Sequence, residues 1–111
     1  MAEYGEWNRK GASLSDKTAN KEYGVDLEFI ENGIREGKLE YRQGSVHGNP
    51  YLKLLRSQLE PYIAEKLGAE RLSQVKNRTE LRKIKNEINR LNNQLKELQI
   101  KKMELENRLE Q

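Results

Sequence analysis

Residues 81–109, which decide the C-terminal part of the fold, read LRKIKNEINRLNNQLKELQIKKMELENRL. Apolar residues recur in this stretch at alternating intervals of three and four, which is the heptad repeat of a coiled coil. The seam consists of Leu81, Ile84, Ile88, Leu91, Leu95, Leu98, Lys102, Leu105 and Leu109, so eight of its nine positions are apolar. A stripe this narrow suits one or two partner helices, and we expect residues 68–111 to form a helix that dimerises.

Lys102 is the exception in the seam, and it bears on the number of helices. Its aliphatic stem can reach water more easily from a two-helix seam than from a closed core of three or four helices, which favours a dimer. The orientation stays open at this point. A parallel dimer would pair Lys101 with Glu106 but Glu87 with Asn92, so these flanking residues specify the direction only weakly.

The sequence before this repeat has a different composition. All eight glycines and both prolines of the 111 residues lie at or before residue 68. Residues 1–67 carry 10 Lys and Arg against 11 Asp and Glu, whereas residues 68–111 carry 11 against 7, so the net charge of +3 comes from the C-terminal part. Gly68 is therefore the expected boundary. The register fails upstream of Leu81, and one helix through residues 76–79 is favoured over a second helix start there.

Several classes of function are not expected from this composition. With no Cys and a single His, the chain offers no basis for a disulfide, a metal site or a metal cofactor. No stretch approaches the roughly 18 apolar residues of a membrane span, and the first residues lack the apolar core of a signal peptide. We therefore expect a cytoplasmic, non-enzymatic protein whose residues 1–12 form a flexible arm.

Residues 13–67 predict a small folded domain that begins with two short helices. Ser13 or Ser15 is placed to cap the first helix, which Gly24 would end. Asp26 is placed to cap the second helix, and Gly37 to end it. Two short helices joined by a tight glycine turn are typical of a helix-turn-helix.

A hairpin and a third helix should complete this domain. Strands are predicted at Leu39–Arg42 and Tyr51–Leu55, joined by a loop at Gln43–Pro50, with Tyr41 opposite Tyr51. Ser57 and Glu60 have the spacing of a capping box at the start of the next helix. The expected core contains Ile30, Ile34, Leu39 and Leu59.

In this order of elements, the chain resembles the excisionase and MerR-like family of winged helix-turn-helix proteins. The likeness spans about residues 15–65, and its most specific strings are Ile34-Arg35-Glu36-Gly37-Lys38-Leu39 and Leu55-Arg56-Ser57-Gln58-Leu59-Glu60. The resemblance implies a mainly α fold with a small β-hairpin, in which a winged helix-turn-helix domain at 13–67 precedes a long dimerising coiled-coil helix. It also implies binding of duplex DNA, with the second helix in the major groove and the wing on the backbone. MerR-like regulators pair through an antiparallel coiled coil, so the resemblance leaves both orientations open.

Polar and basic residues on the expected DNA-facing elements are the candidate contacts: Lys17, Lys21, Asn32, Arg35, Arg42, His47, Lys53 and Arg56. Arg9 and Lys10 would add cations from the arm. The exposed positions of the second helix also include Asp26, Glu28 and Glu31, which is the wrong charge for a phosphate-lined groove. Two functions follow: a small DNA-binding regulator or recombination accessory factor, or a non-enzymatic interaction module that uses the acidic helix and the coiled coil as a scaffold.

A further basic stretch lies at residues 71–90, where Lys and Arg outnumber Glu. A basic helix before a leucine seam resembles basic-zipper proteins only loosely. Direct insertion into a groove, an auxiliary contact with phosphate or RNA, and an ordinary solvated helix surface remain the alternatives.

Overall fold

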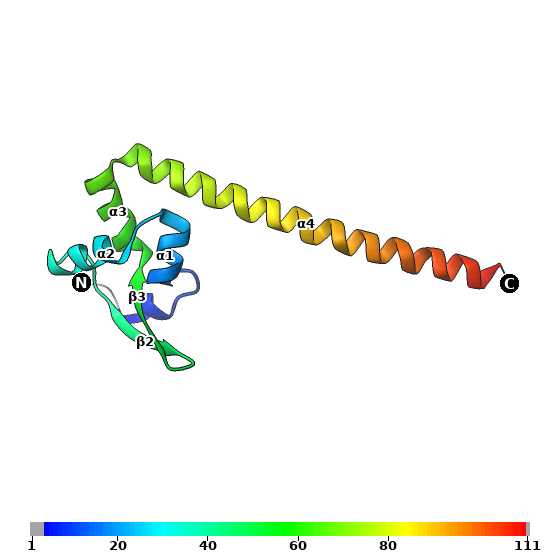
Figure 1. The fold of residues 1–111 in the computed structure, drawn as a ribbon, viewed down its shortest axis with the longest axis horizontal. Coiled ribbons are helices and arrows are strands. Elements are labelled where there is room, and N and C mark those ends of the chain that lie inside the picture. Colours follow the sequence, from blue (N-terminus) through cyan, green and yellow to red (C-terminus); the bar gives the residue numbers. More distant parts are fainter. Residues whose placement is uncertain (1–3, 111) are drawn as a thin grey trace. The chain divides into compact units, whose positions relative to one another are not determined.

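The computed structural model describes residues 4–110, which divide into two compact units between Asn77 and Arg78. The fold is mainly helical, with a small three-stranded antiparallel sheet and a long C-terminal helix (Figure 1). The elements are a 3-10 helix η1 (Tyr4–Asn8), β1 (Ser13–Ser15), α1 (Asp16–Tyr23), α2 (Leu27–Arg35), β2 (Arg42–Val46), β3 (Asn49–Leu55), α3 (Arg56–Leu67) and α4 (Ala69–Leu109).

Helices α1 and α2 begin and end where local sequence signals predict. The Ser15 hydroxyl accepts a hydrogen bond from the Thr18 N–H at 3.1 Å, and the Asp26 carboxylate accepts one from the Phe29 N–H at 2.8 Å. These caps satisfy N–H groups that have no partner within the helix. Gly24 closes α1 in the left-handed conformation, with a φ of 71°.

The sheet has the order β1-β3-β2, and two of its features differ from the sequence prediction. Strand β1 was not expected, although Leu14 is buried between two half-buried serines in the alternation typical of a strand. The hairpin is also tighter than expected, because its loop consists of His47 and Gly48 alone. Both have positive φ values, 53° and 82°, as the favoured two-residue hairpin turn requires.

This shorter loop changes the cross-strand pairing in the hairpin. Tyr41 lies outside β2, and the partner of Tyr51 is Gly44 instead. The Tyr51 ring occupies the space beside Gly44, where an added Cβ would lie 2.5 Å from a ring carbon. The prediction of a Tyr41–Tyr51 pair was therefore wrong, because the register places the ring over a glycine.

Helix α3 starts without the expected capping box. Its N-cap is Leu55, which provides no side-chain hydrogen bond. Ser57 instead donates to the carboxylate of Glu6 in η1, and Glu60 accepts a hydrogen bond from the Tyr23 hydroxyl. Ser57 and Glu60, which the local pattern assigned to capping the helix, therefore bind residues that are distant in sequence.

The N-terminal residues correct the expectation of a flexible arm at 1–12. Residues 1–3 lie outside the described part of the chain, but η1 packs on the domain and Trp7 is only 4% exposed. The carbonyl of Ala12 accepts a hydrogen bond from the Arg56 N–H at 2.9 Å. Burial of the large Trp7 side chain lowers the free energy of the packed segment below that of a solvated arm.

The main core forms between α1, α2, α3 and the inner face of the sheet. It includes the predicted Ile30, Leu39 and Leu59, and Ile34 packs against it while half-buried. Val75 at the start of α4 is also a member, which extends the first compact unit to Asn77. The expected boundary at Gly68 is thus an element boundary, with the glycine at a φ of 94°, but the packed unit continues for two more turns.

The second unit comprises residues 78–111, and α4 continues through it without the break considered at 76–79. Its apolar seam is uncovered in the single chain. The exposed fractions are 52% for Leu81, 47% for Ile84, 49% for Leu91 and 62% for Leu98. No other described residue of this unit covers the seam, because the unit is one helix.

Candidate functional site

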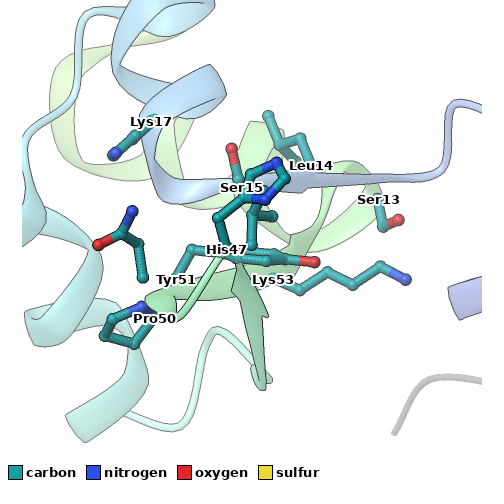
Figure 2. A pocket seen from close by; sticks show the side chains of 10 residues that line it. Ser13, Leu14, Ser15, Lys17, His47, Pro50, Tyr51 and Lys53 are labelled. Atoms are coloured by element: carbon teal, nitrogen blue, oxygen red, sulfur yellow. The ribbon is translucent and has the colours of Figure 1, made fainter.

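A concave surface of about 520 Å³ lies on the outer side of the sheet (Figure 2). We call it the basic groove. Three of its lining residues were predicted contacts: Lys17 from α1, His47 from the hairpin turn and Lys53 from β3. The others are Ser13, Leu14, Ser15, Val46, Asn49, Pro50 and Tyr51. None of these ten described residues is Asp or Glu. Lys17, His47 and Lys53 therefore make the lining basic.

Strand register explains why these residues share one surface. Ser15 pairs with Lys53 across β1 and β3, and Arg42 pairs with Lys53 across β2 and β3. Paired residues of an antiparallel sheet project from the same face. The inner face carries Leu14, Leu52 and Leu54 towards the core, whereas Ser15, Lys53 and Tyr51 lie on the outer face.

The groove has the chemistry of an anion site. Lys17 and Lys53 provide ammonium groups, and Ser13, Ser15 and Tyr51 provide hydroxyls that can donate hydrogen bonds. Figure 2 shows the Lys17 and Lys53 ammonium groups on opposite sides of the His47 imidazole in that view. Spaced cations with intervening donors suit several oxygens of an extended polyanion better than one small ion.

Arg42 lies beside the groove rather than in it. Its guanidinium carbon is 4.6 Å from the centroid of the Trp7 ring, a cation–π contact. The buried indole holds the Arg42 side chain on the face that also presents Lys53. The N-terminal segment thus positions a cation next to the groove, a role that the sequence prediction of a flexible arm missed.

A second groove, of about 690 Å³, has the opposite charge. Its lining includes Asp16 and Glu31 and the half-exposed Leu27, with no basic residue. Pro50 and Tyr51 line both this acidic groove and the basic groove, so the start of β3 separates them. The Asp16 carboxylate is partly occupied, because it accepts a hydrogen bond from the Leu52 N–H at 2.9 Å.

The two predicted contacts on α2 are not brought to the basic groove. Asn32 and Arg35 are hydrogen bonded to each other on an exposed surface. They line a third concavity, together with Phe29, Glu36, Tyr62, Lys66 and Leu67. Lys21 on α1 lines none of these three concavities. The predicted DNA-contact residues are therefore divided among several surfaces.

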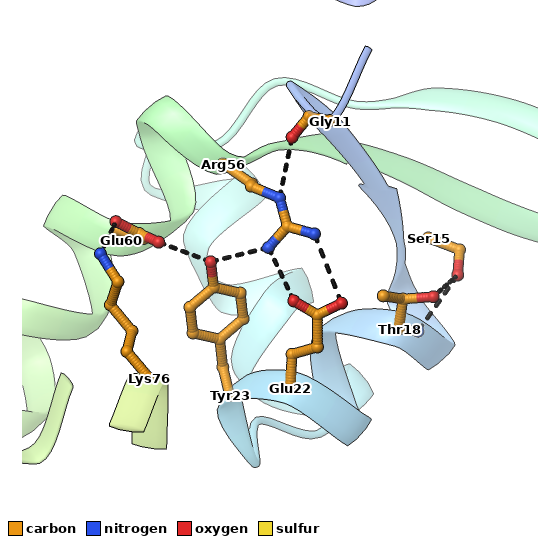
Figure 3. Close-up of polar contacts among 8 residues, drawn as sticks. All are labelled: Gly11, Ser15, Thr18, Glu22, Tyr23, Arg56, Glu60 and Lys76. Atoms are coloured by element: carbon orange, nitrogen blue, oxygen red, sulfur yellow. Dashed lines mark hydrogen bonds and ion pairs between the residues drawn. The ribbon is translucent and has the colours of Figure 1, made fainter. Parts of the chain in front are cut away.

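Arg56, one of the predicted phosphate contacts, has several hydrogen-bond partners inside the domain (Figure 3). Its Nε donates to the Gly11 carbonyl at 2.9 Å, and its Nη1 lies 2.9 Å from both a Glu22 carboxylate oxygen and the Tyr23 hydroxyl. A second bond from Nη2 reaches Glu22 at 3.4 Å. Most of the guanidinium donors are used inside the domain, so little is left for a ligand.

The same network changes the ionisation of Tyr23. Its hydroxyl donates to Glu60 at 2.5 Å, and Glu60 also binds Lys76 at 3.1 Å. Burial, followed by the hydrogen bond to Glu60, raises the pKa of Tyr23 to about 12, while Arg56 opposes this change. The neutral phenol is the form that fits the network.

Ser13, Ser15 and Tyr51 are the groove residues that sequence reasoning missed. The alternation Ser13-Leu14-Ser15 was a signal for a strand, but three residues are too few to separate from a helix cap by pattern alone. The strand that pairs with the two serines, β3, lies about 40 residues away in sequence. Only the sheet register brings the serine hydroxyls to Lys53, which is two residues from Tyr51 in β3.

Comparisons of the chain with protein-family models, curated proteins and solved structures give no match. Across residues 4–110, no helix is both long and apolar enough to cross a membrane. The same residues contain no group of three metal-ligating side chains placed to hold an ion.

Proposed function

We propose that the chain is a winged helix-turn-helix protein that binds duplex DNA as a homodimer and acts as a small transcriptional regulator or a recombination accessory factor. In this assignment α1 and α2 form the helix-turn-helix, and the β2–β3 hairpin is the wing. The family resemblance in residues 15–65 and the order of the elements support this reading.

The observation that carries the proposal is the convergence of Lys17, His47 and Lys53 on one groove without a carboxylate. Single lysines on a surface are ordinary, but two lysines and a histidine from three separate elements, with no carboxylate among them, favour positive potential on one face. Neutralisation of phosphates by Lys and Arg supplies most of the affinity of non-specific DNA binding. The outer face of the wing is thus the proposed contact with the DNA backbone.

The proposed dimer follows from the uncovered seam of α4. Leu81, Leu91 and Leu98 are each about half-exposed in the single chain. A second helix would cover this stripe, and burial of apolar surface contributes roughly 25 cal/mol for each Å² removed from water. Two copies would also double the phosphate contacts on one DNA molecule.

A titration of random-sequence duplex DNA at several salt concentrations tests the proposal. We expect binding at about 50 mM salt that weakens by orders of magnitude towards about 200 mM, because each phosphate contact releases counterions. Absence of binding at the low-salt end would contradict DNA binding.

The acidic groove favours a second candidate function, a protein-interaction module. Glu31 and Asp16 flank the half-exposed Leu27 on the α2 side of the hairpin, where a DNA-reading helix would meet phosphates. A basic, partly apolar peptide would be complementary to this surface. Recovery of such a partner through Glu31, without DNA binding, would support this alternative.

A further inference from the structure

The free edge of strand β2 is separate from the outer face of the sheet that forms the proposed DNA contact. In the order β1-β3-β2, each of the two outer strands has one free edge. Proteins usually protect such edges with very short strands, proline, lysine or a bulge, because unpaired backbone groups there can pair with another chain. Strand β1 has only three residues. Strand β2 has five, pairs with β3 at every position without a bulge, and contains neither proline nor lysine; its single charged residue is Arg42 at its start.

The hairpin register shows which backbone groups of β2 point away from the sheet. Val46 and Asn49 flank the two-residue turn, where the two strands exchange hydrogen bonds. Hydrogen-bonded and non-hydrogen-bonded pairs alternate along an antiparallel ladder, so Gln43 and Ser45 occupy non-hydrogen-bonded positions. The N–H and C=O groups of these two residues are therefore directed to the free edge.

Two features of β3 agree with this assignment. Ser45 is paired with Pro50, which has no N–H to donate. Gln43 is paired with Leu52, whose N–H donates to the Asp16 carboxylate instead of to β2. Within residues 4–110, no backbone hydrogen bond from outside the sheet reaches Gln43 or Ser45, and both residues are exposed.

The acidic groove lies directly beside this edge. Gln43 and Ser45 line it, together with Leu52 of β3 and with Leu27 and Glu31 of α2. A strand added to β2 would therefore run along the groove. Because paired residues of an antiparallel sheet project from the same face, the added residues opposite Gln43 and Ser45 would project to the side that carries Leu52. Their side chains would meet α2 across the groove.

We infer that β2 accepts an extended basic segment of another protein as a fourth, antiparallel strand. The inference rests on the second candidate function, the protein-interaction module, and adds the mode of binding and the chemistry of the partner. Gln43 and Ser45 would each exchange two backbone hydrogen bonds with the segment, which is the source of affinity when a peptide adds to a sheet. Antiparallel addition continues the pattern of this sheet and is the more stable pairing for each residue.

The groove specifies two side chains of the segment. Leu27 and Glu31 are one turn apart on α2, about 6 Å along the helix axis. Residues two apart on one face of a strand are separated by about 6–7 Å, which matches this spacing. One such residue can pack its apolar side chain on Leu27, which is 49% exposed, while the other places a lysine or arginine beside Glu31. An acidic segment would meet like charge in a groove that has no basic lining residue.

A synthetic peptide with this pattern is the probe. In the sequence Thr-Lys-Thr-Val-Thr-Lys-Thr-Val, lysine and valine alternate on one side of an extended chain and threonine occupies the other side. Fluorescence anisotropy with a labelled copy measures its affinity for the full-length chain. The version with glutamate in place of both lysines should bind at least about fivefold more weakly, because it places negative charge beside Glu31.

Methylation of selected backbone nitrogens of the peptide tests the strand pairing on the native chain. In antiparallel pairing, the lysines and valines opposite Gln43 and Ser45 direct their N–H groups to β2, and the threonines direct theirs away. N-methylation of the lysines and valines should therefore weaken binding at least about tenfold, since two backbone hydrogen bonds are lost. N-methylation of the threonines removes no such bond, so it is the matched control and should change the affinity less than about twofold.

Variants of the chain test the same edge from the other side. Ser45→Pro removes an N–H directed to the edge and should weaken peptide binding at least about tenfold. Proline is tolerated at an edge position of this kind, and the hydrogen bonds between β2 and β3 do not use the Ser45 N–H. Ser45→Ala keeps the backbone groups and is the control that should bind like the native chain. Glu31→Gln should weaken binding about two- to fivefold. Denaturant melts establish that each variant is folded.

The outcomes separate this inference from the functions proposed above. Loss of binding on N-methylation of the lysines and valines, together with the effects of Ser45→Pro and Glu31→Gln, supports strand addition. Binding that depends on Glu31 but tolerates both N-methylated peptides would overturn strand addition and leave the interaction module standing. Equal binding of the lysine and glutamate peptides would overturn the basic partner. Absence of binding at about 1 mM peptide would overturn the inference and the interaction module together. The salt titration with duplex DNA measures the DNA-binding proposal independently of all these results.

Discussion

Arg56 of α3 and Glu22 of α1 form an ion pair in which Nη1 lies 2.9 Å from a carboxylate oxygen. Both side chains are substantially buried, and the guanidinium also binds the Tyr23 hydroxyl and the Gly11 carbonyl. One side chain therefore connects α3 to α1 and to the segment before β1. In this environment Arg56 stabilises the domain, whereas Lys17 and Lys53 remain in an open groove that a ligand can reach.

The first prediction concerns the pH dependence of stability. The pKa of Tyr23 rises from its ordinary value of 10.0 to about 12 in the folded domain, mainly through burial. Folding favours the protonated phenol, so this contribution is fully present below about pH 10 and is lost as the pH rises towards about 12. The free energy of unfolding of Tyr23→Phe should therefore approach that of the native chain between these pH values.

Denaturant melts from about pH 8 to about pH 11.5 measure this difference, and Tyr41→Phe is the matched control for loss of an exposed hydroxyl. Only the difference between variant and native chain is interpreted, because lysines titrate over the same range. If the difference in the free energy of unfolding between Tyr23→Phe and the native chain stays constant up to the highest pH, the hydrogen-bond network of Tyr23 is contradicted.

The second prediction is that Gly33→Ala destabilises the first unit. In an exposed helix this change would stabilise by about 1 kcal/mol. Here the added Cβ would lie 2.5 Å from Cδ1 of Leu39 and 2.9 Å from Cε2 of Tyr62. Overpacking of this kind costs about 1–3 kcal/mol. Glu31→Ala, on the exposed side of the same helix, is the control, and a gain of stability in Gly33→Ala would show that α2 packs less closely than described.

The third prediction is that Leu91→Asp combined with Leu98→Asp converts the proposed dimer to monomers. Carboxylates placed in two apolar layers of the seam carry a large desolvation cost. The first unit should keep its stability, because all members of its core cluster lie at or before Val75. Light scattering measures the mass and denaturant melts measure the fold. Asn93→Asp with Asn86→Asp, on the outer face of the helix, provides the control and should remain dimeric.

The fourth prediction separates the two candidate functions. Lys17→Gln and Lys53→Gln should each weaken binding of random duplex DNA and reduce the slope of log affinity against log salt by about 0.9 for each copy that contacts DNA, and so by about 1.8 for the proposed dimer. Lys38→Gln, at a lysine 3.9 Å from Glu65 and outside the basic groove, is the control. Fluorescence anisotropy with a labelled duplex gives both quantities.

Glu31→Gln completes this comparison. If α2 lies near DNA, removal of the negative charge should strengthen non-specific binding by relieving repulsion from phosphates. If the acidic groove binds a protein instead, the variant should leave the affinity for DNA unchanged and weaken recovery of a basic protein partner.

The sequence alone determined the features that depend on neighbours within a turn or two. The caps at Ser15 and Asp26 satisfy N–H groups three residues away. The seam from Leu81 to Leu109 follows from the helical period, because residues three and four apart share a face. Such local patterns predicted the ends of α1 and α2 and the long helix α4, and they placed Ile30 and Leu59 in the core.

Only the tertiary structure decided which distant surfaces meet. Arg56 looked like a phosphate contact, but its partners Glu22 and Gly11 are 34 and 45 residues away and consume its donors. Strand β1 forms because it pairs with the central strand β3 at the edge of the sheet, and that pairing places Ser15 beside Lys53. Hydrogen bonds and charges of this kind depend on register and burial, which no short sequence window contains. Lys17, His47 and Lys53, which are far apart in sequence, line one basic groove for the same physical reason.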